Sequence, residues 1–114
     1  MAQPQRVRRY FNADVAILTG TASYADVVAA RTGLSMFLTL ATLSITTHAA
    51  DVYTIDDDGS GPVIAVHTDA AAAAGILSVV TWDFGDDGTP ITGNVDVSHS
   101  STGVARLHIE GYFI

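Results

Sequence analysis

The stretch that most constrains the fold runs from Ile76 to Gly88 and reads ILSVVTWDFGDDG. From Ile76 to Phe84 its residues alternate with a period of two and include β-branched and aromatic side chains, which is typical of a β-strand with one buried face. The glycines and aspartates after Phe84 favour a turn. Because the chain's single tryptophan lies near the end of this strand, we predict that it is the central core strand.

Length and composition predict a domain that is held together by packing alone. The 114 residues include no cysteine, which excludes disulfide bonds and thiolate metal sites. No apolar run reaches the roughly 18 residues that a membrane-spanning helix needs. The basic start, MAQPQRVRRYF, is not followed by an apolar segment. We therefore expect neither a membrane span nor a secretory signal.

Charge is distributed unevenly along the chain. Arg6, Arg8 and Arg9 lie in the first nine residues, whereas all twelve acidic residues lie at or after Asp14. From Tyr10 onward two arginines stand against these twelve acids, a formal charge of −10. Such an acidic body repels phosphate groups, so we expect it to bind neither nucleic acid nor anionic membranes.

Residues 1–12 are interpreted as a basic arm and residues 13–114 as a single domain. Gln3-Pro4-Gln5 works against regular structure in the arm. Two interpretations of its arginines remain open. The arm is either solvated or docked on an acidic neighbour.

The segment from Ser23 to Gly33 fits two structures. Ser23 and Asp26 have the spacing of a capping box, and Gly33 could end a short helix. The run from Asp26 to Ala30 also fits a brief edge strand. We favour the strand.

The longest β signal runs from Leu34 to Thr47. Its large apolar residues occupy even-numbered positions up to Leu40 and odd-numbered positions from Leu43 onward. A slip of one residue turns side chains to the opposite face, so we predict a bulge near Ala41–Thr42. A long strand that bends midway is expected to cross from one sheet of a sandwich to the other.

Two hairpins are predicted in the rest of the chain. The first joins Asp51–Ile55 to Pro62–Thr68 through a polar loop, and the alanine-rich segment Asp69–Gly75 that follows is either a helical turn or a loop. The second joins the strand Val104–Ile114 to the segment around Val95–Ser98. Matching their apolar faces pairs Val97 with Leu107, Val95 with Ile109 and Asp96 with His108.

These segments amount to about seven or eight strands, with turn signals about every ten residues and no long helix. This spacing indicates an all-β fold. We predict an antiparallel β-sandwich of jelly-roll type.

No motif predicts catalysis. The loop Asp56–Gly61 reads D-x-D-x-S-G, but the glutamate that would complete an EF-hand is replaced by His67. A solvated turn is favoured there, and a looser calcium site is left open. The other histidines, His48, His99 and His108, have no metal-binding spacing and are interpreted as surface or rim residues. No serine has a nucleophile context, so we expect no enzyme activity and no cofactor.

Two segments resemble a class of small tailed-phage and prophage virion proteins. They are VVAARTGLSMFLTLATLSITTHA (Val27–Ala49) and WDFGDDGTPITGNVDVSHSSTGVARLHIEGYFI (Trp82–Ile114), which closes with S-x-x-G-V-x-x-x-x-x-x-G-Y. The resemblance covers roughly residues 24–114. It implies a jelly-roll-like homotrimer that decorates or cements a capsid, or serves as a module of a fibre or tail. The pattern contains no functional side chains, so it assigns no site residue.

The resulting expectation is a non-enzymatic virion protein, made in the host cytoplasm, that decorates a phage capsid. Its partners would be the major capsid protein and further copies of itself. The predicted capsid contact consists of Arg6, Arg8, Arg9, Tyr10 and Phe11. The predicted self-association contact is the apolar end formed by Tyr112, Phe113 and Ile114, which has to be covered by its own sheet or by a neighbour.

The alternative expectation is a carbohydrate-binding β-sandwich module of a phage fibre or tail. Trp82 or surface tyrosines would stack on the sugar. The acidic loops would hold calcium.

Overall fold

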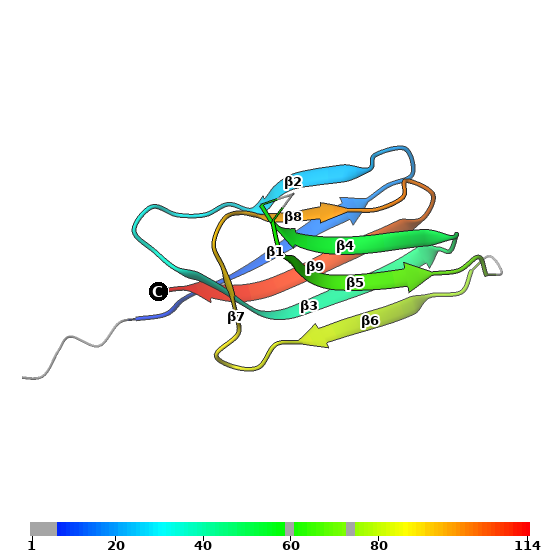
Figure 1. The fold of residues 1–114 in the computed structure, drawn as a ribbon. Coiled ribbons are helices and arrows are strands. Elements are labelled where there is room, and N and C mark those ends of the chain that lie inside the picture. The colour runs from blue at the N-terminus through cyan, green and yellow to red at the C-terminus, as the bar shows by residue number, and fades with distance from the viewer. Residues whose placement is uncertain (1–6, 59–60, 73–74) are drawn as a thin grey trace, which may run out of the picture.

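The computed structural model describes residues 7–58, 61–72 and 75–114, which form nine β-strands in two antiparallel sheets (Figure 1). The five-stranded sheet contains, in order, β1 (Arg9–Ile17), β9 (Val104–Phe113), β3 (Met36–Thr47) and β6 (Ser78–Asp83), and β7 (Thr89–Ile91) also pairs with β3. The four-stranded sheet contains β2 (Ser23–Val28), β8 (Val95–Ser98), β4 (Asp51–Asp57) and β5 (Val63–Asp69). Among the described residues there is no helix that could span a membrane.

The strand order is that of a jelly roll. With β7 set aside, β1 pairs with β9, β2 with β8, β3 with β6 and β4 with β5. These four pairs result when one long antiparallel hairpin is rolled into two packed sheets. The predicted all-β, jelly-roll-like sandwich is confirmed. The three-residue strand β7 takes the count in the described chain to nine.

The core lies between the two sheets and is lined by alternate residues of every long strand. In β9 the inward residues are Ala105, Leu107, Ile109, Gly111 and Phe113, as the alternation predicts, and all five are buried. Leu107 and Ile109 are at most 1% exposed. Burial of these apolar side chains is the main source of stability. The chain has no cysteine, so no disulfide bond adds to it.

Strand β3 contains the predicted change of parity. Met36 and Leu38 are buried, and so are Ala41, Leu43 and Ile45. The shift in register with β9 falls between Leu38 and Leu40, slightly before the predicted position. The bulge does not carry β3 into the other sheet. Instead, the strand changes neighbour on one side, from β7 to β6.

The prediction that Ile76–Phe84 forms the central strand is wrong. Its strand, β6, lies at the edge of the five-stranded sheet, and Val80 and Trp82 on its inner face are only half-buried. β9 and β3 are the interior strands. Alternation reveals that one face of a strand is apolar, but it does not reveal how many neighbours the strand has.

The predicted hairpin of β8 with β9 is also wrong. β8 pairs with β2 and β4, whereas β9 pairs with β1 and β3 in the opposite sheet. Val97 and Leu107 therefore belong to the same core but come from opposite sheets. Two strands with matching apolar faces can either pair edge to edge in one sheet or face each other across a core. Their apolar side chains are buried in both arrangements.

The remaining segments bear out the sequence analysis in part. The segment from Ser23 forms a strand, as favoured, and β4 and β5 form the predicted hairpin. Ala70 to Ala72 form no regular element, and the next two alanines lie outside the described residues. The arm was predicted to reach residue 12, but β1 begins at Arg9. From that residue onward the chain pairs with β9, starting with Arg9 opposite Phe113.

Candidate functional site

The predicted capsid-contact residues from Arg9 to Phe11 lie in strand β1. The side chain of Tyr10 is 72% exposed on the outer face of the sheet. Phe11 points inward and packs against Phe113, with ring centroids 5.1 Å apart. The strand therefore divides these residues between solvent and core. Arg6 lies outside the described residues.

Arg8 holds the start of the described chain against the loop between β6 and β7. Its guanidinium group donates to the carbonyl of Asp86 at 2.9 Å and to the carboxylate of Asp87 at 2.7 Å. It also lies over the ring of Tyr112, 4.3 Å from the centroid. The bond to Asp87 is the chief reason that the pKa of Arg8 is raised. Since this pair is open to solvent, its contribution to stability is small.

The predicted self-association residues at the end of the chain are covered by the chain itself. Tyr112 and Phe113 are 3% and 2% exposed. Phe113 enters the core, while Tyr112 lies on the outer face and stacks on Phe37, with centroids 5.1 Å apart. The backbone of Ile114 pairs with that of Ser35 in both directions. Self-association is therefore not needed to cover this apolar end.

A buried ion pair between Asp51 and His99 lies at one end of the sandwich. Neither side chain is exposed, and Nδ1 of His99 lies 2.8 Å from Oδ2 of Asp51. Nε2 of His99 lies 2.6 Å from the carbonyl oxygen of Thr21 and 3.1 Å from that of Leu18. Carboxylate and carbonyl oxygens accept hydrogen bonds, so both ring nitrogens of His99 lie against acceptors.

The carboxylate of Asp51 also receives two backbone hydrogen bonds, from Ser100 at 2.5 Å and from Gly103 at 2.8 Å. Burial alone would raise the pKa of Asp51, but the bonds from His99, Gly103 and Ser100 together lower it to about 2. The pair thus joins the start of β4 to the β8–β9 loop and to the β1–β2 loop. We call β1, β2 and these two loops the closed flank.

The ion pair is structural and is not the base of a catalytic triad. A triad needs the second ring nitrogen of histidine to face a nucleophile. Nε2 of His99 faces two carbonyl oxygens instead, and the ring is sealed from solvent. The interpretation of His99 as a rim residue is therefore wrong, because its polar neighbours in the sequence gave no sign of burial.

Tyr53 and Gly103 complete the packing around this pair. The ring of Tyr53 stacks on His99 with centroids 5.5 Å apart, and burial, with a smaller effect of Asp51, raises the pKa of Tyr53 to about 12. A Cβ at Gly103 would collide with the Tyr53 hydroxyl and crowd Asp51. Only glycine allows the β8–β9 loop to approach this closely.

The other histidines differ in exposure. His48 is a second buried histidine, with a side chain 3% exposed and Nδ1 2.9 Å from Asp69. His108 lies on the outer face as expected, but its partner is Asp14 on β1, 3.1 Å away. The predicted partner Asp96 is in the other sheet.

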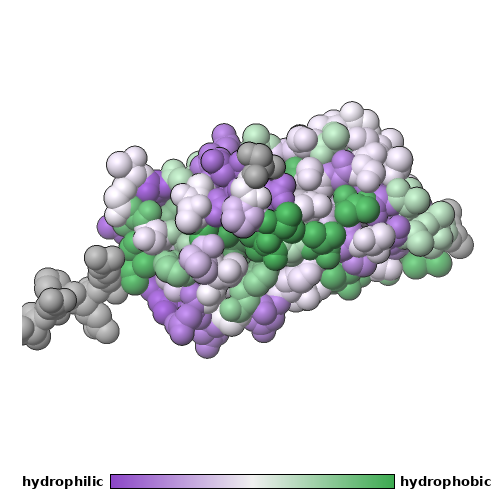
Figure 2. Space-filling model, in the orientation of Figure 1, coloured by the Kyte–Doolittle hydropathy of each residue, from purple (hydrophilic) through white to green (hydrophobic). Residues whose placement is uncertain are grey.

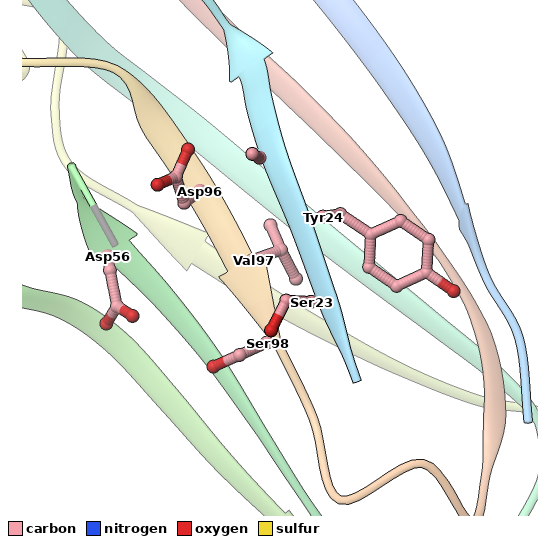
Figure 3. Close-up of a pocket in the computed structure, with 7 residues that line it drawn as sticks. Ser23, Tyr24, Asp56, Asp96, Val97 and Ser98 are labelled. Carbon is pink, nitrogen blue, oxygen red and sulfur yellow. The ribbon is translucent and has the colours of Figure 1, made fainter. Parts of the chain in front are cut away.

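Two aspartates from neighbouring strands share a small pocket on the outer face of the four-stranded sheet. Asp56 of β4 lies opposite Asp96 of β8, beside a pocket of about 80 Å³. In Figure 3 the ring of Tyr24, which also lines the pocket, extends away from both carboxylates. Burial, followed by repulsion from Asp96, raises the pKa of Asp56. The pocket is too small for a ligand much larger than a few water molecules.

Asp57, in the segment considered for calcium, fixes a neighbouring turn. Its carboxylate accepts hydrogen bonds from the backbone and hydroxyl of Thr92 and from the backbone of Gly93, all between 2.7 and 2.9 Å. These bonds lower the pKa of Asp57 against the opposing effect of burial. Within the described parts of the chain, no three acidic, histidine or cysteine side chains are grouped to hold a metal ion.

Apolar side chains gather on the flank formed by β5 and β6. Figure 2 shows this surface as a green band over the region of the two strands. Across the described residues, no hydrogen bond joins β5 to β6. We call β5, β6 and their surroundings the open flank. Its exposed apolar residues are between 40% and 62% accessible and belong to both sheets. Val52, Val63 and Val66 lie on the outer face of the four-stranded sheet, Val79 lies on the outer face of the five-stranded sheet, and Ile76 and Leu77 come just before β6.

The aromatic residues considered for sugar stacking do not form a platform. Trp82 lies on the inner side of β6 and packs against the core. Tyr53 is buried, and Tyr24 is half-buried with its hydroxyl accepting the backbone N–H of Leu18 at 2.7 Å. Tyr10 alone among these is widely exposed.

Comparison with known proteins found only distant structural likeness. No family model and no curated protein matches the chain. Among solved structures, a chain from the disulfide-linked pili of Bacillus endospore appendages is similar to it. The match has 12% sequence identity and a TM-score of 0.46, and it covers 98% of this chain and 96% of the other.

Sequence reasoning missed both the ion pair and the open flank. Asp51 and His99 are 48 positions apart, and nothing in their spacing links them. The open flank could have been suspected from Ile76 and Leu77, two large apolar residues that lie just before β6.

Proposed function

We propose that this protein is a non-enzymatic structural subunit that works by joining protein surfaces, and that it decorates a bacteriophage capsid as an oligomer. The open flank carries this proposal. Val52, Val63 and Val66 are exposed together on the outer face of the four-stranded sheet, and Val79 is exposed on the outer face of the five-stranded sheet. Exposed apolar patches mark sites of contact between proteins. A surface of this kind favours a contact between proteins.

The chemistry of the interior supports a structural role. Asp51, His99 and Asp57 are engaged in hydrogen bonds that fix loops. The pocket beside Asp56 holds only about 80 Å³, and the pair of His99 with Asp51 faces no nucleophile. These polar groups stabilise the fold and leave the outer surface for recognition.

The choice of a phage capsid as the assembly comes from the sequence resemblance. The jelly-roll order agrees with what that resemblance implies, although many functions use this fold. The proposed partner is the major capsid protein. Val63 and Val66, on the outer face of the four-stranded sheet, are the proposed contact residues. A decoration protein of this kind stabilises a shell through many modest contacts repeated over many copies.

The test is co-sedimentation with shells assembled from the major capsid protein of the phage or prophage that encodes this chain. We expect saturable binding in a fixed ratio to capsid subunits. The variant Val63→Asp/Val66→Asp should lose binding, because it adds charge to the contact. The matched control Ala16→Asp, at an exposed position of β1 away from this contact, should still bind. Shells that take up no wild-type protein would overturn the capsid proposal.

A further inference from the structure

Strand β6 leaves one side of its backbone without a partner. It pairs with β3 from Ser78 opposite Ile45 to Asp83 opposite Leu40, with no shift in register. Among the described residues no strand pairs with its other side. A regular edge of this kind presents unpaired N–H and C=O groups that can extend the sheet into another chain.

The longer edge strands β1, β2 and β5 carry features that oppose pairing. β2 is interrupted at Asp26, which has a φ of 55°, and its register with β8 shifts there. β1 carries the charged residues Arg9 and Asp14, both exposed. β5 ends at Asp69, and the ladder that it forms with β4 is irregular near Asp56. Bulges and charges are the usual protection of sheet edges.

β6 has no such protection over most of its length. From Ser78 to Trp82 it contains no charged residue and no bulge. Val79 is 57% exposed on the outer face, and Leu77, just before the strand, is 62% exposed. The edge is therefore both regular and apolar.

We infer that β6 pairs antiparallel with β6 of a second copy of this chain, across a two-fold axis at Val80. This inference rests on the proposed function, since it supplies the contact through which the subunit oligomerises. The two five-stranded sheets then form one continuous sheet. In this register Val79 lies opposite Thr81 of the second copy on the outer face, and Ser78 lies opposite Trp82 on the inner face.

A second copy fits this edge better than an unrelated strand because β6 complements itself. A two-fold axis perpendicular to the sheet keeps inner faces together, so the half-buried Val80 and Trp82 of both copies remain on the core side. Asp83, the one charged residue of β6, falls opposite Leu77 and not opposite another acid. The pairing places no like charges opposite each other, which would destabilise the ladder.

This contact leaves the other half of the open flank free. Val52, Val63 and Val66 belong to β4 and β5 in the four-stranded sheet, which has its own edge. The dimer therefore presents two copies of the proposed capsid contact. A two-fold contact predicts two copies of the chain, not the three implied by the sequence resemblance.

The test is the solution mass by light scattering, with charge variants that report the register. The wild type should have twice the 11.9 kDa mass of one chain. In Val79→Lys/Thr81→Lys each lysine faces a lysine of the other copy, so the mass should fall to one chain. In Val79→Lys/Thr81→Glu each lysine faces a glutamate, and the dimer should be retained. Val66→Lys on β5 is the matched control and should remain dimeric.

Circular dichroism of each variant shows whether it is folded. Should the double-lysine variant fail to fold, hydrogen exchange of the wild type provides a second test. The β6 amides should exchange more slowly at high protein concentration than at low.

Three results would overturn the inference: a wild-type mass of one chain, a mass of three chains, or a double-lysine variant that stays dimeric. The capsid co-sedimentation assay is independent of these results. A monomer that binds shells would end the β6 inference alone, whereas a β6 dimer that binds no shell would end the capsid proposal alone.

Discussion

On the closed flank, polar groups from two loops and from the start of β4 converge on one buried ion pair, whereas on the open flank no hydrogen bond joins the described residues of β5 and β6 and both strands expose apolar side chains. The Asp51–His99 pair joins the β1–β2 loop, the β8–β9 loop and the start of β4. The open flank exposes apolar residues such as Val63 and Val79. The difference indicates that one flank holds the fold together and the other is available for partners.

Two aspartate–histidine pairs show why burial matters to this comparison. Asp51 and His99 are fully buried, whereas Asp14 and His108 on the outer face are 46% and 36% exposed. Water can replace the partner of an exposed ion but not that of a buried one. The same two residue types are therefore expected to contribute very differently to stability.

The largest expected effect is that of Asp51→Ala. It leaves Nδ1 of His99 and the backbone N–H groups of Ser100 and Gly103 without their buried partner, so we expect a loss of about 3–5 kcal/mol of unfolding free energy. Urea denaturation measures it. The matched control, Asp14→Ala in the exposed pair, should lose less than about 1 kcal/mol. Equal losses in the two variants would remove the distinction between the pairs.

Acid should weaken the closed flank specifically. The folded-state pKa of Asp51 is about 2, against an ordinary value of 3.8. A lowered carboxyl pKa contributes stability that is present above the ordinary value and is lost as the pH falls through the folded value. We expect about 2 kcal/mol to disappear between roughly pH 4 and pH 2.

Unfolding free energies measured across this pH range test the prediction. Asp51→Asn removes the titrating group and should flatten this part of the profile. An equally steep profile in that variant would assign the acid sensitivity to other carboxylates.

A smaller loss is expected from Tyr24→Phe, which also lies on the closed flank. Its hydroxyl accepts the backbone N–H of Leu18 at 2.7 Å. The site is partly open to water, so the lost hydrogen bond should cost about 1 kcal/mol or less. A thermal or urea melt of the variant measures it. A loss as large as that of Asp51→Ala would mean that Tyr24 has a packing role beyond this bond.

The smallest effect on stability is expected on the open flank. Val63→Thr/Val66→Thr changes two exposed side chains and should alter the unfolding free energy by no more than about 0.5 kcal/mol. Leu107→Ala in the core should cost about 2–5 kcal/mol. If the threonine variant were as unstable as the core variant, the open flank would be part of the fold and not a free surface.

The sequence carried most of the information about individual strands. The alternation of β9 correctly assigned its five inward residues, because period two is a local property of an extended chain. The parity change in β3 revealed a bulge for the same reason. Turn residues placed the β4–β5 hairpin, whose two strands are neighbours in the chain.

The pairing of distant strands was not predictable in this way. The apolar pattern predicted a central β6 and a hairpin of β8 with β9. Both predictions were wrong because apolar faces match whether two strands pair in one sheet or face each other across the core. The Asp51–His99 pair was missed because it depends on loops that meet after the sheets have packed. The predicted capsid and self-association residues were chosen from charge and from position in the chain, which do not report burial.

The sequence by itself determined that this protein is an antiparallel β-sandwich, since the two-residue period and the turn residues act locally along the chain. The tertiary structure alone decided which strands became edges and which polar residues became buried. The physical reason is that edge and burial are properties of neighbours in space. β6 became an unprotected edge, and His99 became an enclosed side chain, only when residues distant in the sequence were brought beside them.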